Sequence, residues 1–85
     1  GNGIMNQAEW VAKAKYRGYR EIVACHAPGG WLLSGRGEPG EPGQTLPAKR
    51  GHNRQFQSLD TALRFLADAG IDEFRVMIPG SGLSS

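Results

Sequence analysis

The architecture of this chain is set by residues 54–78, RQFQSLDTALRFLADAGIDEFRVMI. Their pattern predicts the end of one strand, a capped helix and a second strand. Ser58 is a good N-cap because its hydroxyl accepts a hydrogen bond from the free N–H groups of the first turn, and Gly70 favours the left-handed conformation that ends a helix. Apolar side chains recur at helical spacing between them and predict a buried face of Leu59, Ala62, Leu63 and Leu66, widened by Phe65 and Ala69.

The rest of the chain predicts a second helix and several strands. Asn6 and Glu9 resemble a capping box, which starts a helix over residues 7–17 that Gly18 ends. Strands are expected over residues 20–27 and 31–34, joined by the turn Pro28-Gly29-Gly30, and short ones over 44–50 and 54–56. The last strand is expected where Phe74, Val76 and Ile78 alternate with Arg75 and Met77, which is the period of a half-buried strand with the first three residues on its buried face. The order predicts an α+β fold, a mostly antiparallel sheet of three to five strands with two helices on one face.

Length and composition predict one small domain. With 85 residues, 39% of them hydrophobic, the chain builds a modest core. We interpret residues 1–4 as a cloning remnant before Met5, residues 5–78 as the domain and residues 79–85 as a flexible tail. No run approaches the roughly 18 apolar residues of a membrane span, and the single cysteine, Cys25, forms no internal disulfide. We therefore expect a soluble cytoplasmic protein that needs no cofactor.

Residue patterns typical of enzymes and metal sites are missing, so we expect no catalytic residue and no metal ligand. Cys25 and His26 are adjacent on a predicted strand and point to opposite faces. A zinc site built from Cys25, His26 and His52 fails on ligand count and spacing. The carboxylates around the helix ends are explained by capping and solvation, and no small-molecule substrate is evident.

The basic segment over residues 49–54 is the best candidate for nucleic-acid binding, and DNA is a possible partner. Its Lys and Arg side chains neutralise phosphates, and a narrow hairpin can follow a phosphate backbone. The candidate residues are Lys49, Arg50, His52 and Arg54, extended by Arg17 and Arg20 if the first helix ends beside the hairpin. The formal net charge of +2 alone does not indicate a polyanion partner. A solvated edge that discourages sheet-to-sheet aggregation explains the same residues.

The second face of the predicted sheet is the candidate for protein contacts. Both central strands carry apolar residues on both faces, whereas the helices cover only one. Val23, Cys25, Leu32 and Met77 are therefore expected to form an interface with a protein partner or with a second copy, as in a homodimer. Residues 37–43, GEPGEPG, are expected to form a mobile loop, whose role the sequence leaves open.

Several short motifs carry a resemblance to a known family. They are Arg17-Gly18-Tyr19, Gly30-Trp31-Leu32-Leu33, Arg54-Gln55-Phe56, Ser58-Leu59-Asp60-Thr61-Ala62, and Gly70-Ile71 before Phe74-x-Val76. With them the chain resembles the small partition-associated proteins of bacterial plasmids and integrative elements, often labelled the ParC family and distinct from the topoisomerase subunit of that name. An orphan protein of a mobile gene cassette is the alternative. The loop over residues 37–43 is longer than the hairpin expected for the family.

The resemblance implies an accessory role in plasmid partition or maintenance, through DNA or a partition protein and without catalysis. It supplies no catalytic residues.

Two functions follow as hypotheses. The first is a non-enzymatic accessory protein that acts through protein contacts or self-association, and the alternative is a nucleic-acid-binding module that uses the basic hairpin.

Overall fold

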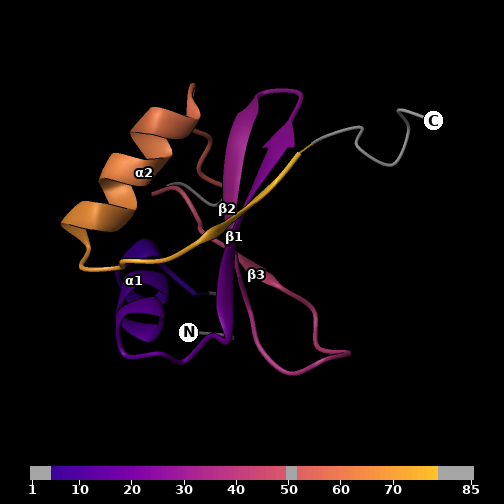
Figure 1. Ribbon diagram of the computed structural model, residues 1–85, viewed down its shortest axis with the longest axis vertical. Helices are drawn as coiled ribbons and strands as arrows, with labels where there is room; N and C mark the ends of the chain where they lie inside the picture. Colours follow the sequence, from indigo (N-terminus) through magenta and orange to yellow (C-terminus); the bar gives the residue numbers. More distant parts are fainter. Residues whose placement is uncertain (1–4, 50–51, 79–85) are drawn as a thin grey trace.

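The helices and strands alternate irregularly along the chain and form two layers (Figure 1). The computed structural model describes residues 5–49 and 52–78. The elements are α1 (Gln7–Lys15), β1 (Glu21–Ala27), β2 (Gly30–Arg36), β3 (Gln44–Thr45), α2 (Leu59–Asp68) and β4 (Arg75–Met77). The strands form one sheet in the order β3-β2-β1-β4, and both helices lie on the same side of it. The predicted α+β class is confirmed. The predicted remnant over residues 1–4 and the tail over 79–85 lie outside the described residues.

The sheet is antiparallel except at one edge. β1 and β2 form a hairpin around Pro28 and Gly29, β3 pairs antiparallel with β2, and β4 pairs parallel with β1. The strand predicted over residues 44–50 is shorter than expected, and the one over 54–56 is a single bridge, between Phe56 and Trp31. Phe56 therefore lies beside β2 on the edge opposite β4. The parallel pairing follows because α2 carries the chain across the sheet, as parallel connections require.

Local side-chain chemistry starts both helices as predicted. The Glu9 N–H donates to Asn6 Oδ1 at 2.8 Å and the Asn6 N–H donates to Glu9 Oε1 at 2.9 Å, which completes the capping box of α1. At α2 the Thr61 N–H donates to the Ser58 hydroxyl at 3.2 Å. These bonds satisfy backbone donors that the first helical turn leaves free.

Both helices end in the same backbone motif, but with different residues in the left-handed position. In α2 this residue is Gly70, at φ 86°, as predicted, and the Ile71 N–H closes the motif on the Leu66 carbonyl at 2.9 Å. In α1 it is Arg17, at φ 63°, whereas Gly18 follows it and donates to the Lys13 carbonyl at 2.7 Å. The prediction that α1 extends to Arg17 was therefore wrong, because the helix already ends at Lys15.

The core lies between the helices and the covered face of the sheet. It consists of the buried residues Trp10, Tyr19, Ile22, Ala24, Leu33, Leu46, Phe56, Ala62 and Leu66. Gly35 belongs to this layer because a Cβ there would lie 2.4 Å from the Tyr19 ring. Three residues predicted to be buried are exposed instead: Leu63, Val76 and Ile78. The covered side of α2 consists of Ala62, Leu66 and Phe65, whose ring centroid lies 5.5 Å from that of Phe56, and Leu63 lies outside this side and faces solvent.

Candidate functional site

The face of the sheet turned away from α1 and α2 is called here the open face. Ile22 and Ala24 belong to the core, so the alternate residues of β1 point to the open face. Cys25 is in register with Leu32 on β2 and with Met77 on β4, and residues in register point to the same face. Three of the four predicted interface residues therefore form a line across three strands, and Met77 is 46% exposed.

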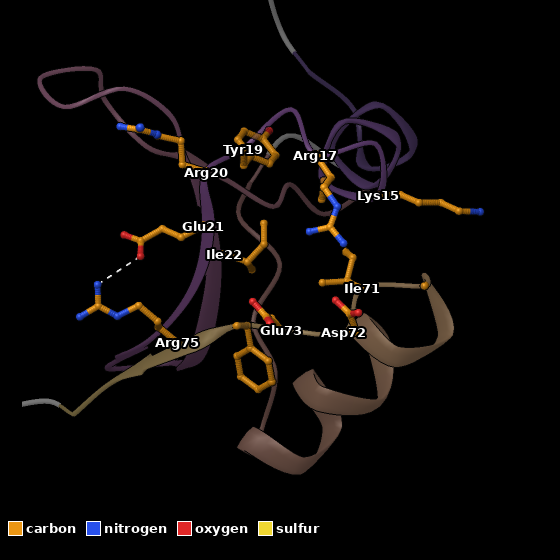
Figure 2. A pocket seen from close by; sticks show the side chains of 13 residues that line it. Lys15, Arg17, Tyr19, Arg20, Glu21, Ile22, Ile71, Asp72, Glu73 and Arg75 are labelled. Carbon is orange, nitrogen blue, oxygen red and sulfur yellow. Dashed lines mark hydrogen bonds and ion pairs between the residues drawn. The ribbon is translucent and has the colours of Figure 1, made fainter.

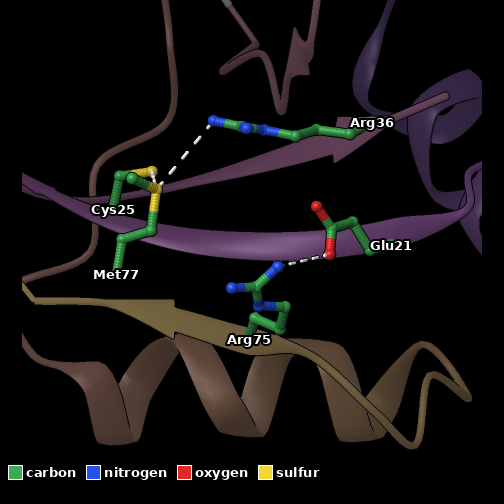
Figure 3. Close-up of polar contacts among 5 residues, drawn as sticks. All are labelled: Glu21, Cys25, Arg36, Arg75 and Met77. Atoms are coloured by element: carbon green, nitrogen blue, oxygen red, sulfur yellow. Dashed lines mark hydrogen bonds and ion pairs between the residues drawn. The ribbon is translucent and has the colours of Figure 1, made fainter. Parts of the chain in front are cut away.

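The fourth predicted interface residue, Val23, belongs to the same face but is covered. Arg36 on β2 is opposite Glu21, and Met77 on β4 is opposite Cys25. A contact between the Arg36 and Met77 side chains therefore crosses β1 over Val23, which lies between Glu21 and Cys25. The Arg36 Nη2 donates to the Met77 sulfur at 3.9 Å (Figure 3). Val23 is accordingly only 2% exposed. A partner reaches it only if the Arg36 and Met77 side chains move apart.

Charged and polar side chains surround this apolar line. Arg75 Nη1 lies 3.1 Å from Glu21 Oε1, an ion pair whose carboxylate is half-buried (Figure 3). On the β3 side the hydroxyls of Ser34 and Thr45 are 3.1 Å apart. An apolar centre with an arginine-containing rim is the usual composition of a protein interface.

The chain segments on either side of residues 50 and 51 pair with each other as the arms of a hairpin, and the described basic residues of this hairpin differ in their contacts. Pro47 and Asn53 form an isolated bridge, and the Ala48 N–H donates to the His52 carbonyl at 2.6 Å. Lys49 and His52 are exposed. Arg50, another predicted nucleic-acid contact, lies outside the described residues.

Arg54 makes intramolecular contacts rather than extending into solvent. Its guanidinium carbon lies 4.8 Å from the Phe56 ring centroid and 5.3 Å from that of Phe65. Its Nη1 also donates to Gln7 Oε1 at 3.4 Å. The guanidinium therefore joins the hairpin to α1 and α2.

The remaining basic candidates do not join the hairpin. Arg20 Nη1 lies 3.5 Å from Glu38 Oε1 in the Gly-Glu-Pro loop. Arg17 and Arg20 line a cleft beside β1 to which the hairpin contributes no residue. The helix residues that do lie beside the hairpin are others: Lys15 and Tyr16 line a groove of about 680 Å³ together with Lys49.

The only cysteine occupies the middle of the open face. Cys25 is a free thiol, and its sulfur lies 3.6 Å from the Met77 sulfur (Figure 3). His26 points to the other face, where its ring meets the Trp31 ring edge-on at 5.0 Å. Among residues 5–49 and 52–78, no group of three His, Cys, Asp or Glu side chains is close enough to hold a metal ion. In the same part of the chain, neither helix is long and apolar enough to span a membrane.

Comparisons with protein-family models, curated proteins and solved structures find no match. The resemblance to partition-associated proteins is therefore neither supported nor contradicted, and the candidate site rests on the geometry of this chain.

Sequence reasoning missed one feature, a cleft of about 660 Å³ between the turn after α1 and the segment that joins α2 to β4 (Figure 2). Asp72 and Glu73, attributed to helix-end solvation, form part of its wall. The sequence feature that could have indicated this cleft is the distribution of charge, because basic residues flank the end of the first helix and acidic residues follow Gly70. The sequence does not indicate that these two helix ends meet.

Proposed function

We propose that this chain is a non-enzymatic binding module that associates with a protein partner or with a second copy of itself through the open face. The supporting observation is the line of Leu32, Cys25 and Met77 across three strands, on the face without a helix. Methionine fills irregular surfaces because its side chain is unbranched and polarizable. The Glu21–Arg75 pair and Arg36 supply the polar rim.

The resemblance to partition-associated proteins extends this proposal to a biological role. We place the protein in the bacterial cytoplasm, as an accessory factor in the maintenance of a plasmid or another mobile element. A reducing compartment keeps Cys25 a thiol, which an apolar interface on this face requires.

A pair of variants on one strand tests the proposal. Met77 and Val76 are adjacent on the edge strand β4 and similarly exposed, 46% and 40%, but they point to opposite faces. Met77→Glu places a charge on the open face, whereas Val76→Glu places the same charge on the other one. In sedimentation equilibrium of the purified protein, we expect Met77→Glu to abolish self-association and Val76→Glu to preserve it.

Cys25 gives a second readout of the same experiment. The rate at which a maleimide labels this thiol falls on dimerisation if the open face is the interface. Equal effects of Met77→Glu and Val76→Glu, or unchanged labelling on association, contradict an interface there. If the protein stays monomeric, the variants and the labelling are applied to binding of purified partition proteins of the source element.

Nucleic-acid binding is the second candidate function, and it is favoured by the groove between α1 and the hairpin. Tyr16 is 77% exposed, the Lys15 ammonium lies 6.0 Å from its ring centroid, and Lys49 lines the same groove. An exposed aromatic ring between lysines is suited to stacking a base beside its phosphates.

This geometry changes the residues to be tested. Lys49→Ala and Tyr16→Ala are expected to weaken binding of a single-stranded oligonucleotide, and Arg20→Ala, distant from the groove, is the control. Binding must also weaken as salt rises, because phosphate contacts release counterions. Equal loss in all three variants contradicts a site in this groove.

A further inference from the structure

The cleft beside the start of β1 brings together the C-terminal ends of both helices (Figure 2). One wall comes from the end of α1 and the turn that follows it, the other from residues 70–75. The Lys15 side chain lies over Gly70, where an added Cβ would be 3.5 Å from Lys15 Cε. A volume of about 660 Å³ is within the range of small-molecule sites in proteins.

The two walls carry opposite charges that do not neutralise one another. Arg17 lies on the α1 side, and its side chain points toward the segment that holds Asp72 and Glu73 (Figure 2). The ion pairs found among residues 5–49 and 52–78 do not join Arg17 to either carboxylate. Of the other charged side chains that line the cleft, Glu21 pairs with Arg75 and Arg20 pairs with Glu38. The Lys15 side chain points away from the acidic segment, and its ammonium lies 6.0 Å from the Tyr16 ring centroid. Arg17 thus faces two carboxylates across an open space.

The backbone of Arg17 gives independent support for a role of this side chain. At φ 63° it occupies the left-handed position that glycine usually takes in helix ends of this kind, as Gly70 does in α2. A non-glycine residue there is strained, and such strain concentrates at binding sites. Glycine would close α1 without strain, but it would remove the only guanidinium that points toward the acidic wall in Figure 2.

The chemistry of the walls restricts the ligand. A simple anion meets repulsion from Asp72 and Glu73, and a simple cation meets it from Arg17. Ile22, Ile71 and Phe74 supply apolar surface between the charges. A matching ligand therefore has a carboxylate at one end, an ammonium at the other and an apolar body between them.

We infer that this cleft binds a short zwitterionic peptide, with the peptide carboxylate on Arg17 and its amino group on Asp72 and Glu73. The site is separate from the open face, to which it contributes only the Glu21–Arg75 pair. Binding of peptide and association through the open face are therefore measurable independently.

The test uses the tripeptide Ala-Phe-Ala in four forms: with both ends free, N-acetylated, C-amidated and blocked at both ends. Each is titrated into the ¹⁵N-labelled protein at low salt, and amide chemical shifts give the affinity and the location. Shift changes are expected around residues 14–22 and 70–75. Blocking both ends is expected to weaken binding about tenfold or more, because each charged hydrogen bond is lost.

The variants assign each end of the peptide to a wall. Arg17→Gln is expected to weaken the peptides with a free carboxylate about fivefold or more and to leave the amidated peptide unaffected. The double variant Asp72→Asn/Glu73→Gln is expected to do the reverse, weakening only peptides with a free amine. Arg64→Gln is the matched control, because Arg64 pairs with Asp60 on the exposed side of α2. Arg17→Gly repeats the loss of the guanidinium in a backbone that accepts glycine.

Three results would overturn the inference. The first is equal binding of the free and the doubly blocked peptides. The second is shift changes outside the cleft, or none at millimolar peptide. The third is a stability coupling between Arg17→Gln and Asp72→Asn in a double-mutant cycle without peptide, because the two charges would then pair with each other and close the cleft.

Discussion

The indole N–H of Trp10 donates a 2.7 Å hydrogen bond to the backbone carbonyl of Gln44. Trp10 is fully buried on α1 and Gln44 begins β3, so one side chain attaches the first helix to the edge of the sheet. The Lys13 ammonium and the Tyr19 hydroxyl also reach Gln44, through its side-chain oxygen, at 3.3 and 2.7 Å. The position of β3 therefore depends on contacts with residues far away in the sequence.

Trp10→Phe is expected to lower the free energy of unfolding by about 2 kcal/mol, because it removes the donor and leaves the Gln44 carbonyl without this partner. Urea unfolding followed by circular dichroism measures the change. Trp31→Phe is the control, since Trp31 is only partly buried and its ring contact with His26 survives the change. Equal losses in the two variants would show that the hydrogen bond to Gln44 does not contribute.

Arg17→Gly is expected to stabilise the protein by about 0.5–1 kcal/mol. The left-handed conformation costs an arginine roughly 1–2 kcal/mol, and glycine gives back part of this gain as greater freedom in the unfolded chain. Gly70→Ala, at φ 86°, is the reciprocal variant and is expected to destabilise by about 1 kcal/mol. Thermal unfolding of both variants shows whether Arg17→Gly raises stability and Gly70→Ala lowers it. If Arg17→Gly instead lowers stability, the contacts of the arginine side chain stabilise the fold by more than the left-handed backbone destabilises it.

Tyr19 is expected to make stability depend on pH in the alkaline range. Burial raises the pKa of Tyr19 to about 12, so the folded state keeps its phenolic proton where the unfolded state loses it, near pH 10. The contribution is complete below pH 10 and disappears as pH rises toward 12, a loss of about 2 kcal/mol. Urea midpoints at pH 9 and pH 11 measure the part of this loss that falls between them, about 1.3 kcal/mol. Tyr19→Phe is expected to reduce the loss of stability between pH 9 and pH 11. Tyr16→Phe, at an exposed position, is the control and is expected to leave this loss unchanged.

Arg54→Ala is expected to destabilise the protein by about 1–2 kcal/mol, because the guanidinium stacks on Phe56 and Phe65. Lys49→Ala, on the same hairpin but exposed, is expected to change stability by less than about 0.5 kcal/mol. Guanidinium chloride unfolding of the two variants compares them directly. If both variants change stability by less than about 0.5 kcal/mol, the stacking of Arg54 on the two rings does not stabilise the fold. A loss of nucleic-acid binding in Arg54→Ala has to be corrected for this effect on folding.

The predictable parts of this fold are those determined by neighbouring residues. The capping box of Asn6 and Glu9, the Ser58 cap and the Gly70 stop depend on contacts within one helical turn, so short motifs identify them. The alternation along β1 likewise separates Ile22 and Ala24, which are in the core, from Cys25 on the other face.

The candidate sites were only partly predictable for the same reason. Leu32, Cys25 and Met77 share a face because period-two alternation holds in each strand separately. Whether β4 lies beside β1 is not a local property, and neither is the Arg36–Met77 contact that covers Val23. Lys49 and Arg54 were grouped by closeness in sequence, yet Lys49 is exposed whereas Arg54 packs on Phe56 and Phe65. Arg20 lies apart from the hairpin, in the cleft beside β1.

The sequence by itself determined where the helices begin, where α2 ends, the central hairpin and the α+β class, because capping, turn chemistry and hydrophobic periodicity act over a few residues. Only the tertiary structure decided that β4 pairs parallel with β1, that Leu63 faces solvent, and that Arg17 faces Asp72 and Glu73 across a cleft. These features depend on how α2 crosses and packs on the sheet, which is a balance of contacts between residues distant along the chain.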